Sequence, residues 1–89
     1  MTITSFPSSV QAGGVAVVQG TSSGCLDIIF TVTFNGVVLG SPPVSLTCSN
    51  GNWTLKIDPV PAKVPGEQNV LSVLVEQGGS DASCDIQVI

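Results

Sequence analysis

The stretch "TCSNGNWTLKI", Thr47 to Ile57, decides the fold because it has the pattern of a β-hairpin. Its Asn50-Gly51 pair stands between two segments in which apolar and polar residues alternate, and both residues tolerate the positive φ angles of a two-residue type I′ turn. Pairing Ser49 with Asn52 places Cys48 directly opposite Trp53, and cross-strand partners point to the same face. The hairpin therefore predicts a buried face that contains the chain's only Trp.

The same period-two alternation covers most of the chain, and no helical periodicity competes with it. The clearest strand is Asp27 to Phe34. A second Asn-Gly pair follows it and Val37 to Leu39 leads away, so this stretch also predicts a two-residue hairpin. Further strands are expected at 2–6, 14–20, 70–75 and 82–89, while the Pro-rich stretch 59–66 is a connection. About seven strands in one domain, residues 1–89, indicate the all-β class and an immunoglobulin-like antiparallel β-sandwich.

Alternation also divides the residues between the inside and the outside of this sandwich. The pattern of Trp53 with Leu55 and Ile57 favours a core position for the indole over a sugar-stacking platform. The predicted core comprises Phe30, Val32, Trp53, Leu55, Val73 and Ile86. Three large apolar residues fall on the outward register and would mark an assembly patch if they cluster, namely Ile29, Leu74 and Ile89.

Composition excludes several classes of partner. The 89 residues include 2 basic and 6 acidic side chains, for a net charge of −4. Without clustered Lys and Arg a nucleic-acid partner is not expected. No apolar run approaches the ~18 residues that would insert into a membrane. The N-terminal segment lacks the features of a signal peptide. The sequence is therefore either a domain of a longer secreted protein or a protein that begins with its own Met1.

The three cysteines, Cys25, Cys48 and Cys84, should all lie near one end of the sandwich, given an immunoglobulin-like strand order. They form either one disulfide and a spare thiol or three small buried side chains. We favour Cys25–Cys48 over Cys25–Cys84, because the latter pair would lie two strands apart, about 10 Å. The outward register of Cys25 counts against the favoured pair unless a bulge intervenes. The remaining thiol could bond a neighbouring subunit.

The sequence gives little support for a catalytic site or a metal site. The chain has no His, so no Cys has a neighbouring base, and structural zinc would need four Cys or His ligands. Asp81 and Asp85 flank a turn and are weak candidates for calcium, but that ion prefers 6–8 oxygens and the two residues fit solvated turn positions better. We expect no cofactor and no enzymatic activity.

Four segments resemble the bacterial Ig-like repeat domains: "GTSSG" at 20–24, "SNGNWTLKI" at 49–57, "NVLSVLVEQGGSDAS" at 69–83 and "DIQVI" at 85–89. That family has a Gly near the second strand, a Gly-x-Trp-Thr hairpin and a final pair of alternating strands. The resemblance implies extracellular, usually tandem, non-catalytic modules of surface proteins and adhesins, with related domains on phage heads and tails. The last turn departs from the family's Asp-x-x-Gly-Asn, so its calcium site is not carried over, and three cysteines are unusual there.

These observations predict a structural or interaction module displayed on a cell or virion surface. Its partners would be proteins, such as neighbouring domains, a capsid or a cell-surface protein, and it could form a homo-oligomer. The alternative is a carbohydrate-binding accessory module, which would show a row of exposed aromatic side chains. The chain has only 3 Phe and 1 Trp to build one.

Overall fold

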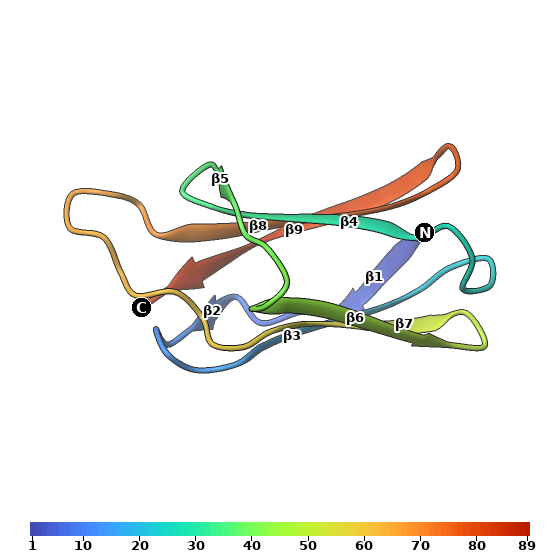
Figure 1. The fold of residues 1–89 in the computed structure, drawn as a ribbon, viewed down its shortest axis with the longest axis horizontal. Coiled ribbons are helices and arrows are strands. Elements are labelled where there is room, and N and C mark those ends of the chain that lie inside the picture. The colour runs from blue at the N-terminus through green and yellow to red at the C-terminus, as the bar shows by residue number, and fades with distance from the viewer.

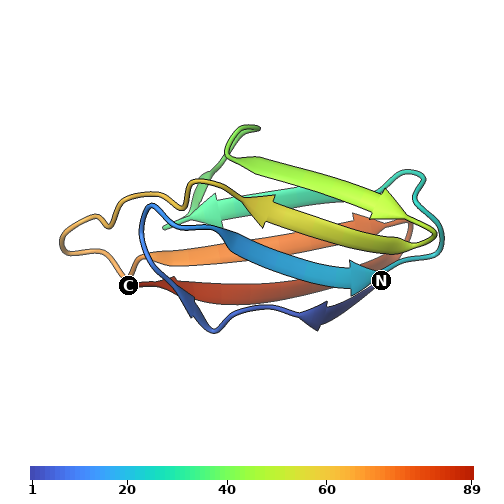
Figure 2. The ribbon, with the colours of Figure 1, turned by 90° about the horizontal axis from the view of Figure 1, so that it is seen from below.

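The computed structural model describes all 89 residues, Met1–Ile89, as two β-sheets packed face to face (Figure 1). The molecule measures 40 × 21 × 21 Å. Its termini lie at opposite ends of the long axis in both views (Figures 1 and 2). No helix in it is long and apolar enough to cross a membrane.

Nine strands make up the two sheets. They are β1 (Thr2–Ser5), β2 (Ser9–Val10), β3 (Ala16–Thr21), β4 (Ile29–Phe34), β5 (Val37–Val38), β6 (Val44–Ser49), β7 (Asn52–Ile57), β8 (Val70–Gln77) and β9 (Ser80–Val88). One sheet has the order β1-β3-β7-β6 and the other the order β2-β9-β8-β4-β5. This is the strand order of an immunoglobulin-like sandwich, so the predicted fold class is confirmed.

The expected strand count and pairing need a correction. The two-residue strand β2 is additional to the strands that alternation indicated, whereas β5 is the short return strand of the hairpin expected at Asn35-Gly36. Strand β2 pairs with β9 in parallel, through Ser9↔Gln87 and Val10↔Val88. Two residues are too few to show alternation, and parallel pairing between the start and the end of a chain leaves no local turn signal.

Both Asn-Gly hairpins form as predicted. The φ angles are 51° and 78° at Asn50 and Gly51, and 51° and 82° at Asn35 and Gly36, so both turn residues are left-handed in each hairpin. In the first hairpin Ser49 pairs with Asn52 and Cys48 with Trp53. This register places the indole between the sheets, where Trp53 is 1% exposed.

The core contains five of the six residues predicted for it, since Val32, Trp53, Leu55, Val73 and Ile86 are all buried. Phe30 is the exception: it is only partly buried and packs against the core from its edge. The Pro-rich connection adds an unexpected core residue, Val60, which is 2% exposed. Its backbone exchanges two hydrogen bonds of 2.8 Å with Gly13 and Gly14, which tie this connection to the β2–β3 loop.

The indole of Trp53 packs directly on Gly20, its cross-strand neighbour in β3. A Cβ atom on Gly20 would lie 2.6 Å from the indole Cε2 and would overlap the Thr2 carbonyl oxygen. Gly20 is therefore required for the large ring to fit between the sheets. The indole Nε1 is buried without a hydrogen-bond partner.

One buried polar side chain, Asn69, holds the connection between β7 and β8 in place. It is 6% exposed and has a φ of 60°. Its Oδ1 accepts hydrogen bonds from Val64 N at 2.8 Å and Asn35 Nδ2 at 3.3 Å, and its Nδ2 donates to the carbonyls of Val64 and Glu67. These bonds satisfy the amide inside the protein, as a buried polar group requires.

Candidate interaction surface

The outer face of the five-stranded sheet carries apolar and acidic side chains. Strand register places Ile29, Glu76 and Asp81 in one row across β4, β8 and β9, and Thr31, Leu74 and Ser83 in the next. Ile29 is 62% exposed. The charged residues on these outward positions are all acidic, whereas the outer face of the other sheet carries Lys56, between Val17 and Ser45.

Two members of the predicted assembly patch lie together and the third does not. Ile29 and Leu74 occupy neighbouring rows on adjacent strands. Ile89 follows β9 at its other end, where its N–H donates to the Val10 carbonyl at 2.9 Å. Eight residues of extended chain separate Ile89 from the row of Asp81, which is about 26 Å.

An apolar side chain that alternation did not identify, Leu26, lies at the same end as Ile29. It is 82% exposed, the largest value among the exposed large hydrophobic residues. Leu26 belongs to the loop between β3 and β4, residues 22–28, which we call the β3–β4 loop. The one sequence signal for it was an isolated Leu between a Cys and an Asp in a stretch otherwise rich in Ser and Gly.

A disulfide between Cys25 and Cys48 joins the β3–β4 loop to β6, with a Cα–Cα distance of 5.7 Å. This confirms the favoured pairing and excludes Cys25–Cys84. The interruption of alternation that this pairing requires is present, because Gly24 and Asp27 have φ angles of 72° and 58° and so leave the extended conformation. The loop can therefore turn Cys25 toward its partner.

Backbone and side-chain hydrogen bonds fix the same loop from two sides. The tip of the β6–β7 hairpin binds it through Ser22 N, which donates to the Gly51 carbonyl at 2.8 Å, and through Gly51 N, which donates to Cys25 Sγ at 3.4 Å. From β8, Gln77 Oε1 accepts from Ser23 N at 3.0 Å. Gln77 Nε2 lies 2.9 Å from the Leu26 carbonyl and 3.1 Å from that of Ser23.

Cys84 is the one free cysteine, and it points inward from β9 opposite Val73. Burial, with a contribution from the Asp85 carboxylate, raises the pKa of its thiol from 9.0 to about 11. Since the thiolate is the reactive form, this environment does not favour the bond to a neighbouring subunit that the sequence left open.

We expect the Cys84 thiol of the folded protein to react with iodoacetamide at pH 7.5 roughly a hundredfold more slowly than the same thiol in urea, because so little of it is thiolate.

The same pKa shift makes the stability of the protein depend on pH. The pKa of the Cys84 thiol is higher in the folded than in the unfolded protein, so its contribution to the free energy of unfolding is complete below pH 9 and is lost as the pH rises toward about 11. Urea unfolding between pH 8 and 11 should show this loss. Cys84→Ala should lack this component of the pH dependence; an identical decline would rule out the thiol as its source.

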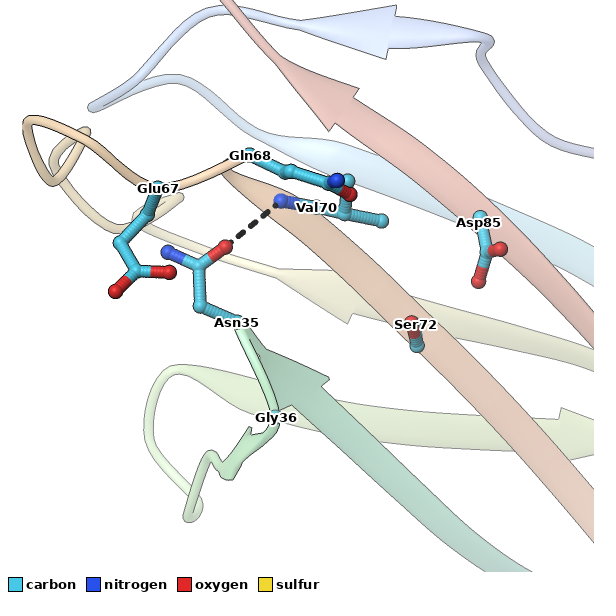
Figure 3. A pocket seen from close by; sticks show the side chains of 7 residues that line it. All are labelled: Asn35, Gly36, Glu67, Gln68, Val70, Ser72 and Asp85. Carbon is cyan, nitrogen blue, oxygen red and sulfur yellow. Dashed lines mark hydrogen bonds between the residues drawn. The ribbon is translucent and has the colours of Figure 1, made fainter.

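Two hollows flank the Asn35-Gly36 turn, at the end of the molecule opposite the β3–β4 loop. The polar one, of about 450 Å³, is lined by Asn35, Gly36, Glu67, Gln68, Val70, Ser72 and Asp85. Glu67 and Asp85 stand on opposite sides of it, and Asn35 Oδ1 accepts a hydrogen bond from Val70 N at 3.2 Å (Figure 3). The apolar one, of about 290 Å³, is lined by Phe34, Asn35, Val37, Leu39, Val64 and Glu67.

The calcium interpretation of Asp81 and Asp85 does not fit the structure. Both residues lie on the outward face of β9, opposite Glu76 and Ser72 respectively. Four residues of extended strand place their backbones about 13 Å apart. Calcium ligands lie about 2.3–2.6 Å from the ion, so these two carboxylates cannot share one. The structure contains no group of three or more His, Cys, Asp or Glu that could hold a metal.

The fold is similar to immunoglobulin-like domains of known structure. Titin domain M4 is 19% identical with a TM-score of 0.57, over 98% of this chain and 91% of that one. The Dscam1 Ig7 domain, isoform 5, is 19% identical with a TM-score of 0.54, over 98% and 92%. The tandem Ig repeats of Dlar are 22% identical with a TM-score of 0.52, over 93% of this chain and 43% of that one.

No family model matches the sequence, and no curated protein matches it. The likeness to solved structures therefore concerns the fold, which is an all-β immunoglobulin-like sandwich.

Proposed function

We propose that this chain is a non-catalytic module that binds protein partners through the outer face of its five-stranded sheet. The observation that carries the proposal is the position of two apolar side chains in neighbouring rows of that face: Ile29, which is 62% exposed and pairs with Glu76, and the half-buried Leu74. Solvent-exposed apolar side chains that cluster on a soluble domain are typical of interaction sites. The similar domains of Dlar and Dscam1 are named as Ig repeats and an Ig domain, which agrees with a modular role.

The structure does not favour the carbohydrate-binding alternative, because its main candidate residue is buried. Trp53 is 1% exposed, so its indole cannot stack on a sugar ring. Phe6, 47% exposed, is the one aromatic among the exposed large hydrophobic residues, and a single ring does not make a row.

The setting that we propose is a surface, either of a bacterial cell, as in an adhesin, or of a virion. The Cys25–Cys48 disulfide supports it, because disulfides persist in oxidising, extracellular environments. The partner would be a neighbouring domain, a capsid or cell-surface protein, or a second copy of this chain.

Site-specific photo-crosslinking in the organism that encodes the chain tests the proposal. A benzophenone side chain at Ser83, exposed in the row of Leu74, should give adducts with another protein on irradiation. The same side chain at Thr47, exposed on the outer face of β6, is the matched control and should give none. Mass spectrometry then identifies the adducts.

Each outcome of this experiment either supports or contradicts the proposed binding face. Adducts from position 83 alone support the proposal, and an adduct with a second copy would identify the module as a homo-oligomer. No adduct from position 83, or equal adducts from 83 and 47, would show that this face is not the binding surface.

A further inference from the structure

We infer that Leu26 is the anchor of this interaction: it inserts into an apolar pocket of the partner protein, and Lys or Arg side chains line the rim of that pocket. This inference rests on the proposed function and names the class of partner. Leu26 is 82% exposed and Ile29, three residues later, is 62% exposed.

The two exposed side chains lie at one end of the sheet. Leu26 is held by its carbonyl to Gln77, the residue after Glu76, and Glu76 is the cross-strand partner of Ile29. Leu26 therefore lies at the same end of the molecule as the row of Ile29, Glu76 and Asp81.

The loop that presents Leu26 is fixed at several points although only its last residue, Ile28, contacts the core. Ile28 packs against the hydrophobic core, but no residue from 22 to 27 belongs to it. The loop is nevertheless fixed by a disulfide at Cys25, by the backbone of Gly51 and by both polar atoms of the Gln77 side chain. Ordering a loop before binding removes an entropic cost from the association itself. The fixed conformation of the loop therefore favours binding through its exposed apolar side chain, Leu26.

Charge defines the rim of the partner's pocket. The acidic residues around Leu26 and Ile29 are Asp27, Glu76 and Asp81. Glu76 lies directly opposite Asp81, an arrangement of like charges that is unfavourable within a sheet and that a cationic partner would relieve. The Met1 ammonium at this end is bonded to Ser80 Oγ at 2.8 Å. Lys56 lies on the other sheet's outer face, and Lys63 lies in the β7–β8 connection at the opposite end.

A second copy of the chain fits this anchor less well. Its own apolar hollow, between Phe34, Val37 and Val64, includes Glu67 in the lining. Insertion of Leu26 there would bring Asp27 toward Glu67, a contact between like charges. A separate protein with a basic rim avoids this repulsion.

Crosslinking from position 83 tests the anchor when it is combined with a second substitution. Leu26→Ser should lower the yield of the adduct at least about tenfold, the effect expected of a central anchor residue. The matched control is Val37→Ser: Val37 is 68% exposed and lies in the same sheet, but at its other end, and the yield should change less than twofold. Thermal unfolding of both variants checks that the fold is retained. Raising the salt from 0.1 to 0.5 M should also lower the yield.

The outcomes separate this inference from the proposed function. An unchanged yield with Leu26→Ser, an equal loss with Val37→Ser, or an adduct only with a second copy would overturn the inference and leave the binding face in place. An absence of adducts in the chain without a second substitution would overturn both.

Discussion

Replacing both bonded cysteines, as Cys25→Ala/Cys48→Ala, is expected to lower the free energy of unfolding by roughly 3 kcal/mol. The disulfide spans a sequence separation of 23 residues, and the chain-entropy model gives about this value for a loop of that length. Such a loss is a large share of the 5–15 kcal/mol typical of a domain. Urea unfolding at pH 7 measures it from the shift of the midpoint, followed by Trp53 fluorescence.

Two controls separate the crosslink from its side chains. The unsubstituted protein under dithiothreitol should unfold at nearly the same urea concentration as the double variant, because both lack the same bond. Cys84→Ala keeps the bond and should remain much closer to the unsubstituted protein. If dithiothreitol leaves the midpoint where it was, the disulfide does not stabilise the folded state and the loop is held by its hydrogen bonds alone.

Most of the fold could be predicted from local patterns in the sequence. Turn chemistry placed both hairpins, because Asn-Gly pairs adopt the left-handed angles that a two-residue loop needs, as at Asn35 and Asn50. Period-two alternation then identified the inward positions, including Trp53. Both signals act between residues that are close in sequence, so a single chain displays them.

The proposed interaction surface was harder to predict because its determinants are not local. Leu26 has no periodic neighbours, and its loop is held by Gln77 from 51 residues further along the chain. Alternation could not place Cys25, because it holds only in extended chain, and Gly24 and Asp27 have left-handed φ angles. Asn69 likewise has a role only through Asn35 and the Val64 backbone, contacts that no spacing rule indicates.

Gly20→Ala is expected to cost about 3 kcal/mol or more, although it adds a single methyl group. That methyl would overlap the Thr2 carbonyl oxygen and the Trp53 indole at once, and the side chains of a packed core have little room to retreat. Urea unfolding gives the loss of stability. The emission of Trp53, 1% exposed in the parent protein, should shift toward longer wavelengths if the ring is forced outward.

A second substitution shows which contact limits the fit. Trp53→Phe in the Gly20→Ala background removes the part of the ring that overlaps the new methyl, so the two substitutions together should cost less than the sum of their separate effects. The overlap with Thr2 remains, but β1 is an edge strand with an irregular register between Ile3 and Ser5 and can shift. Gly79→Ala is the control, since a Cβ there meets nothing within 4 Å, and it should change stability by less than about 0.5 kcal/mol. If Gly20→Ala proves as mild as Gly79→Ala, the indole does not pack on β3 and the arrangement of the core around Trp53 is wrong.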